Sequence, residues 1–86
     1  MEFEFDPEKS DSNAKKHGID FERAQRLWTD LDLMVIPART TDEIRFLAIG
    51  IIGSRHWSAI FTVRNGRIRL ISVRRSRREE IELYES

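Results

Sequence analysis

The chain has 86 residues, of which 40% are hydrophobic, so it can form one core and one domain over residues 1–86. It contains no cysteine, which excludes disulfides, thiolate metal sites and a cysteine nucleophile and is typical of the reducing cytoplasm. The longest apolar run, residues 46–52, is far shorter than a membrane span. The acidic N-terminus is unlike a signal peptide. The net charge of zero argues against a general nucleic-acid binder.

The first third of the chain predicts a short strand followed by two helices. Phenylalanine alternates with acidic residues over residues 3–5, which is the pattern of a strand with one buried face. Asp6 then caps a polar helix over residues 7–16, and Gly18 is a natural place for it to stop. Asp20 caps a second helix, whose apolar stripe is Phe21, Ala24, Leu27 and Trp28.

The rest of the chain predicts four strands and a last helix. The strands are expected at residues 33–36, 46–52, 56–64 and 67–74, with a polar connection at residues 37–43. Ser76 and Glu79 form a capping box that opens a helix through Tyr84. The order β-α-α-β-β-β-β-α predicts an α+β fold, a small mostly antiparallel sheet with two N-terminal helices and one C-terminal helix.

Asn65 and Gly66 form the strongest local signal, a two-residue type I′ hairpin turn. This turn places Arg64 opposite Arg67, and Thr62 opposite Arg69, on one face of the sheet. The other face is expected to enter the core through Phe61, Val63, Ile68 and Leu70. Like charges that face each other destabilise a hairpin unless an anion lies between them, so the arginine face indicates an anion site. The alternative is an exposed edge protected by charge.

Residues 64–78 contain seven arginines and no acidic residue. Four of them flank the expected start of the last helix, where free backbone N–H groups and the helix dipole already favour an anion. Arginine also contacts two phosphate oxygens at once. The alternative is that several arginines pair with carboxylates of the last helix, namely Glu79, Glu80 and Glu82.

Two histidines and one carboxylate are the candidates for proton transfer. His17 ends the first helix beside Lys16, where the helix dipole favours its charged form, although a lone histidine is more often structural. For His56 a structural role is favoured more strongly than for His17. Two histidines without a spaced carboxylate partner predict no metal site. Glu43 alternates with Arg45 on one strand face, so it either forms an ordinary ion pair or holds a functional arginine in place.

Several short motifs occur together and in one order along nearly the whole chain. They are residues 5–9, Asn13, residues 16–19, Phe21, Ala24, residues 43–45, residues 49–50, residues 62–64, residues 69–75, Glu79 and Tyr84. In this pattern the chain resembles the BrnT toxins, which are ribonucleases of type II toxin–antitoxin systems. The family usually has Trp where Phe5 stands. Residues 36–42 lack the Asp and His often found before the Glu-x-Arg element, so we assign no catalytic residue there.

The resemblance implies a single BrnT-like toxin domain over residues 1–86 with a RelE-like fold. It implies cleavage of RNA, with mRNA as the expected substrate, without a metal or other cofactor. It also implies neutralisation by a BrnA-type antitoxin in a hetero-oligomer, with operator DNA bound through the antitoxin.

RNA supplies its own nucleophile, the 2′-OH, so the enzyme must position it, move protons and stabilise the phosphorane. We expect Arg64 and Arg74 to stabilise the phosphorane, His17 to transfer protons with Lys16 nearby, and Glu43 to be the reserve base. The RNA backbone is expected to be bound by Arg45, Arg67, Arg69, Arg75 and Arg78. The guanidinium groups of the last hairpin and the final helix should then converge on one phosphodiester. Two alternatives remain, a non-catalytic RNA- or DNA-binding module that uses the same arginine face and an interaction protein that binds an acidic peptide.

Overall fold

A computed structural model of the chain describes residues 1–39 and 42–86. Residues 40 and 41, which fall inside the predicted connection 37–43, lie outside the described residues. In chain order the elements are β1 (Phe3–Glu4), α1 (Pro7–His17), α2 (Phe21–Ala24), the 3₁₀ helix η1 (Gln25–Thr29), β2 (Met34–Pro37), β3 (Phe46–Ile52), β4 (Arg55–Arg64), β5 (Arg67–Arg75) and α3 (Arg78–Glu85). The predicted α+β class and element order are confirmed, whereas the RelE-like fold stays a prediction.

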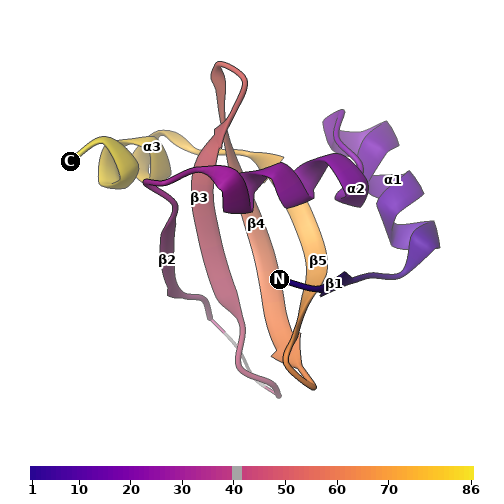
Figure 1. The fold of residues 1–86 in the computed structure, drawn as a ribbon. Coiled ribbons are helices and arrows are strands. Elements are labelled where there is room, and N and C mark those ends of the chain that lie inside the picture. The colour runs from indigo at the N-terminus through magenta and orange to yellow at the C-terminus, as the bar shows by residue number, and fades with distance from the viewer. Residues whose placement is uncertain (40–41) are drawn as a thin grey trace.

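The strands form one sheet in the order β1-β5-β4-β3-β2 (Figure 1). β1 runs parallel to β5, and every other neighbouring pair is antiparallel. Asn65 and Gly66 have positive φ angles of 51° and 75°, as a type I′ turn requires. The turn pairs Arg64 with Arg67, as predicted. We call the end of the sheet at this turn the lower end, and the end at the β3–β4 turn the upper end, as they appear in Figure 1.

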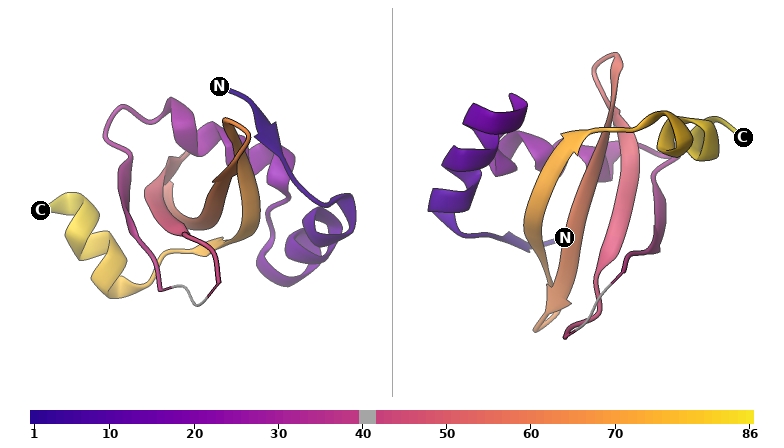
Figure 2. Two further views of the ribbon diagram at one scale, coloured as in Figure 1. Left: turned by 90° about the horizontal axis from the view of Figure 1, so that it is seen from below. Right: turned by 180° about the vertical axis from the view of Figure 1, so that it is seen from behind.

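Helices cover both faces of the sheet at its upper end. The segment from α2 to η1 crosses one face, and α3 lies on the opposite face, as the view from behind shows (Figure 2). Gly50 allows the close approach of η1 to β3, because a Cβ there would lie 3.0 Å from terminal methyl carbons of Leu27 and Leu33. The core on this side consists of Ile19, Phe21, Ala24, Leu27, Ala48, Ile52, Trp57, Ala59, Phe61, Ile68, Leu70 and Val73.

The predicted second helix begins as expected but changes its winding. The side chain of Asp20 accepts the N–H of Arg23 at 2.8 Å and caps α2. After four residues the chain tightens into η1, yet the predicted apolar stripe still faces the core. Leu27 is fully buried, and Trp28 packs edge-on against Phe61 with ring centroids 5.2 Å apart.

The predicted burial of Val63 is wrong. Phe61, Ile68 and Leu70 are buried as expected, but Val63 is 52% exposed. The reason is the position of the covering segment, since α2 and η1 cross the sheet above its lower end (Figure 1). The last residues of β4 therefore have no helix over them.

The side chain of Asn13 joins α1 to the edge of β5 through hydrogen bonds. β1 pairs with this edge only at Ile68 and Arg69, so the upper part of the edge has no neighbouring strand. There the amide nitrogen of Asn13 donates to the carbonyl of Val73 at 2.8 Å, and its oxygen accepts the N–H of Val73 at 3.1 Å. The same nitrogen donates to the carbonyl of Ile19 at 2.8 Å. One side-chain amide thus takes the place of a strand and fixes α1 beside β5.

The predicted cap of α3 is shifted by one residue. The helix begins after Arg77, whose backbone N–H is accepted by the side chain of Glu80 at 2.9 Å. The hydroxyl group of Ser76 instead lies 2.7 Å from that of Ser58. Glu80 rather than Glu79 fills the capping position because its side chain points at the sheet and meets β4 and β5 there.

Asn13→Ala should destabilise the fold by about 2 kcal/mol or more. It leaves buried backbone groups of Val73 and Ile19 without partners, which outweighs the roughly 0.5 kcal/mol that alanine gains in helix propensity. Urea unfolding measures the difference, with Lys15→Ala on the exposed side of the same helix as the control, expected to change stability by less than about 0.5 kcal/mol. Equal stabilities of the two variants would contradict the role given to Asn13.

Candidate functional site

The arginines of the lower end are neutralised by carboxylates. Their ion pairs are Arg64–Glu43 at 3.0 Å, Arg45–Glu43 at 3.5 Å, Arg67–Glu2 at 3.1 Å and Arg69–Glu4 at 2.9 Å. The hydrogen bond from Arg64 holds the pKa of Glu43 below its ordinary value, which makes this carboxylate a weaker base. The prediction of an uncompensated arginine face is therefore wrong at this end of the hairpin. This pairing is not visible in the sequence because two of the acids, Glu2 and Glu4, lie at the N-terminus, more than 60 residues before the arginines that they contact.

The cavity at the lower end does not suit an anion. It has a volume of about 440 Å³ and is lined by Glu43, Ile44, Phe46, Thr62 and Val63. Most of these side chains are apolar, and the one charged group among them is negative.

Arg74 lies at the upper end and is held by Glu80. Its two terminal nitrogens donate to the two carboxylate oxygens at 2.8 and 2.9 Å. Glu80 also accepts from the hydroxyl group of Ser58 at 2.8 Å and from the N–H of Arg77. These bonds, that from Arg74 first, lower the pKa of Glu80 to about 2, and the pKa of Arg74 is raised in turn. The carboxylate of Glu80 is thus charged and nearly buried, and both of its oxygens accept hydrogen bonds.

The guanidinium of Arg74 keeps donors for a further anion. Its side chain is 23% exposed, and beyond the two bonds to Glu80 it makes one longer contact of 3.3 Å to the carbonyl of Arg75. In the described parts of the chain, no acceptor is hydrogen-bonded to its Nε–H. A planar fork fixed on one side by a carboxylate can therefore contact a phosphate with the other.

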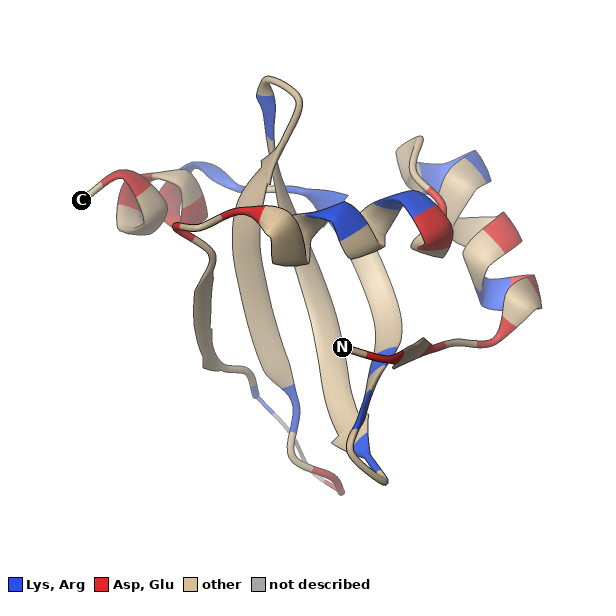
Figure 3. Cartoon of the chain, viewed as in Figure 1, with Lys and Arg blue, Asp and Glu red and all other residues tan. Residues whose placement is uncertain are grey.

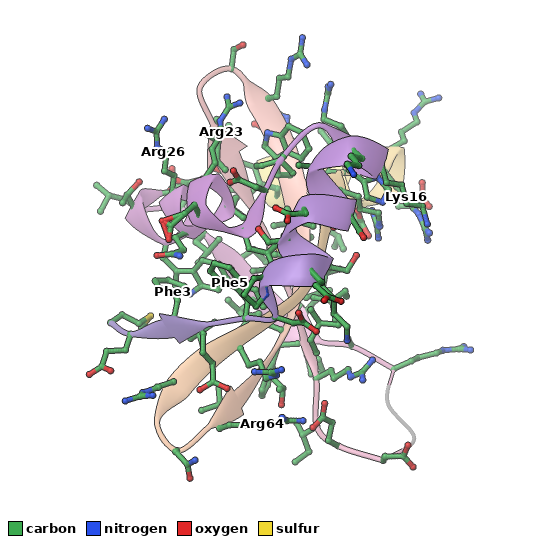
Figure 4. All side chains as sticks on the ribbon, turned by 90° about the vertical axis from the view of Figure 1, so that its right-hand side faces the viewer. Phe3, Phe5, Lys16, Arg23, Arg26 and Arg64 are labelled. Carbon is green, nitrogen blue, oxygen red and sulfur yellow. The ribbon has the colours of Figure 1, made fainter. Side chains whose placement is uncertain are left out.

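A cationic cavity lies between α1 and β5. Its volume is about 190 Å³, and its walls are Lys9, Ser12, Asn13, Lys16, His17, Ile71 and Ser72. Ser72 is two residues from Arg74 on the same strand and therefore on the same face of the sheet. Figure 4 shows Lys16 on the side of the molecule opposite Arg23 and Arg26, and thus away from the face that carries η1. His17 and Lys16 are accordingly brought beside the strand that carries Arg74.

The lower and upper groups cannot meet at one phosphate. Arg64 pairs with Arg67, which is seven residues from Arg74 along β5, or roughly 23 Å at about 3.3 Å per residue. Figure 3 shows the basic residues at both ends of the sheet, with uncharged strands between them, and Figure 4 shows Arg64 at the bottom and Lys16 near the top. The expected convergence of the guanidinium groups of the last hairpin and the final helix on one phosphodiester is therefore wrong.

The other predicted binding residues also belong to the upper end. The guanidinium of Arg75 lies over the ring of Trp57, 5.7 Å from its centroid, and Arg78 is exposed in the first turn of α3. Among residues 1–39 and 42–86, no carboxylate pairs with either arginine. His56 instead contacts Glu85 at 2.7 Å, which agrees with its structural reading.

Sequence reasoning missed four groups that shape the upper site. Glu80 was seen only as one of several possible ion-pair partners, and Ser58, Lys9 and Ser72 were given no role. A signal existed for Lys9 and Ser72, because they lie inside the motifs at residues 5–9 and 69–75. No local signal distinguishes Glu80 from its neighbours, since its partners are on other elements.

Residues 5–80 match the family model described as "Ribonuclease toxin, BrnT, of type II toxin-antitoxin system". The chain belongs to the BrnT family. Members are ribonuclease toxins, and a type II system pairs the toxin with a protein antitoxin. A search of curated proteins finds no match.

Two further observations concern the described part of this BrnT chain. None of its helices is both long and apolar enough to cross a bilayer. Within the same residues, no three side chains of His, Cys, Asp or Glu lie close enough together to hold one metal ion.

Glu80→Gln should make the protein less sensitive to acid. The carboxylate of Glu80 stabilises the fold fully above its unfolded pKa near 4.5, and this contribution is lost as the pH falls towards about 2. Between these pH values wild type should lose on the order of 3 kcal/mol that Glu80→Gln does not lose. Urea unfolding at several pH values measures this difference, with Glu79→Gln as the matched control. A wild-type acid response in Glu80→Gln would refute the assignment.

Proposed function

We propose that this chain is an endoribonuclease that cuts RNA, with cytoplasmic mRNA as its substrate, by attack of the 2′-OH and without a metal ion. The observation that supports this most is the fixed guanidinium of Arg74, two residues along β5 from Ser72, which lines a cavity together with Lys16 and His17. Electrostatic stabilisation needs a donor that is already in place when charge develops. Glu80 provides this by holding one side of the fork and leaving the other open.

The reaction uses groups of the upper end alone. His17 takes the proton of the 2′-OH, whose oxygen attacks the adjacent phosphorus. The remaining N–H groups of Arg74 donate to the non-bridging oxygens as negative charge collects on them. The ammonium group of Lys16 gives a proton to the 5′-oxygen as the P–O bond breaks. The products are a 2′,3′-cyclic phosphate and a free 5′-OH.

The remaining basic groups divide between binding and structure. Arg78, exposed in the first turn of α3, binds the backbone of the RNA beyond the scissile phosphate. Arg75 follows Arg74 on β5 and lies over Trp57 on the opposite face of the sheet, so it takes no part in the reaction. Arg64 and Glu43 take no part in the chemistry of this proposal, because they pair with each other at the lower end. Arg45, Arg67 and Arg69 are likewise held in ion pairs with carboxylates, which leaves them less available to bind the substrate.

The partner in this proposal is a BrnA-type antitoxin that forms a hetero-oligomer with the toxin and binds operator DNA. Family membership supports a protein antitoxin. The antitoxin then acts by blocking the access of RNA to the upper end, either by covering it directly or by binding nearby.

Arg74→Lys should lower the cleavage rate by about 10²–10³-fold, because lysine keeps the charge but loses the fork that Glu80 fixes. The measurement is a time course on purified RNA in EDTA, with mass spectrometry of the 2′,3′-cyclic ends. Arg64→Lys is the matched control and should stay within a few-fold of wild type. Thermal unfolding of both variants reports any loss of fold.

Three results would count against the proposal. Equal losses in Arg74→Lys and Arg64→Lys would place the reaction elsewhere. Inhibition by EDTA would remove the metal-independent mechanism. RNA that is retarded on a gel but never shortened would identify a non-catalytic binding module.

His17→Ala should abolish toxicity in cells, since losing a proton-transfer group costs about 10²–10⁴ in rate. Expression of the wild type alone is expected to stop growth, and co-expression of the product of the adjacent reading frame to restore it. Lys15→Ala, next to the cavity residues but exposed, should remain as toxic as wild type. Growth arrest by His17→Ala at wild-type protein levels would rule out this histidine as the proton carrier.

A further inference from the structure

The cavity between α1 and β5 extends beyond the groups that the proposed reaction uses. Lys9 and Ser12 line it together with Lys16 and Ser72. Lys9 and Lys16 are seven residues apart, two helical turns, so they share one face of α1 about 10 Å apart along its axis. The far end of the cavity, at Lys9, thus lies away from His17 and has no role in the chemistry.

The cavity has an uncompensated positive charge. No acidic side chain lines it, and in the described residues no carboxylate lies within 4.0 Å of the amine of Lys9 or Lys16. This contrasts with the lower end, where each arginine of the hairpin has an acidic partner. The side-chain amide of Asn13 is hydrogen-bonded to the backbone of Val73 and Ile19, so the polar groups left to meet a ligand are amines, hydroxyls and the imidazole of His17. An anion is the ligand that such a set accepts.

The size and the donors of the cavity indicate a phosphate group. Its volume of about 190 Å³ is below the range of roughly 300–1,000 Å³ typical of pockets that enclose whole small molecules. It can admit a phosphate with part of a sugar but not a complete nucleotide. Lysines act as point charges without a planar fork, so they bind a backbone phosphate rather than read a base.

The position of the cavity indicates which phosphate it takes. Ser72 and Arg74 are two residues apart on β5, or about 7 Å. A phosphate at Ser72 is therefore a neighbour of the one at Arg74, not the same group. We propose that the Lys9 end of the α1–β5 cavity binds a non-scissile phosphate of the RNA strand being cut, next to the scissile one. This inference rests on the proposed ribonuclease function, and it assigns Lys9 and Ser12 to substrate binding.

The test uses a DNA oligonucleotide with a single ribonucleotide, so that one bond can be cut. Each flanking phosphate is replaced in turn by a neutral methylphosphonate. In wild type, one of these replacements should lower kcat/KM about tenfold, whereas in Lys9→Gln the same replacement should have almost no further effect. Lys9→Arg should restore the sensitivity, and Lys15→Gln should behave as wild type. If wild type and Lys9→Gln respond alike to every replacement, the proposal is overturned.

A second measurement separates this inference from the ribonuclease function. Inorganic phosphate is titrated into the ¹⁵N-labelled protein at constant ionic strength set with chloride. The backbone amide signals of Ser12 and Ser72 should shift in wild type and in Lys15→Gln but not in Lys9→Gln. If these signals shift while no RNA is cut, the anion site stands and the proposed ribonuclease fails. If RNA is cut but the signals do not move, the cavity is not a phosphate site.

Discussion

The side-chain amide of Asn13 determines where α1 lies, and the upper site depends on that position. The N-terminal strand is only two residues long, so most of the edge of β5 would be left with unpaired N–H and C=O groups. Unpaired strand edges are unstable and invite other chains. By bonding both backbone groups of Val73, Asn13 closes the edge and orients α1 along it. The basic side chains on that face of the helix then lie beside β5, and among residues 1–39 and 42–86 no ion pair holds them there.

Carboxylates determine which arginines remain available to a ligand. At the lower end, exposed acids pair with exposed arginines, an arrangement that adds little stability but cancels the charge. At the upper end, Glu80 is 12% exposed and has four hydrogen bonds, so its pairing with Arg74 is a fixed part of the structure. The same chemical pair thus neutralises one surface and prepares the other for an anion.

Short-range signals made much of the fold predictable. The turn at residues 65–66, the cap at Asp6 and the left-handed Gly18 are each specified by residues within a few positions, and each was found where expected. The pairing of β1 with β5 was not predictable, because it joins segments more than 60 residues apart. For the same reason the partners of Arg67 and Arg69 could not be read from the sequence.

The candidate site was predictable only in part, for a related reason. Residue types indicated arginine and histidine, but not which arginines lie together. The motifs at residues 16–19 and 69–75 marked the two segments that the structure places side by side, at α1 and β5. Glu80 could not be chosen over Glu79 in advance, because its choice depends on Ser58 and Arg74, which only the folded sheet brings to it.

The bonds that hold α3 also hold the guanidinium of Arg74. At its start, Glu80 joins the helix to β4 and β5. Near its end, the hydroxyl group of Tyr84 donates to Asp30 at 2.5 Å, a bond that raises the pKa of Tyr84 to about 12, and Asp30 also accepts the N–H of Ile51. A helix tied at both ends gives its carboxylate little freedom, so Arg74 needs little reorganisation when negative charge develops on a bound phosphate. A ribonuclease whose nucleophile comes from the substrate depends on such fixed donors, because positioning and charge stabilisation are what the protein itself supplies.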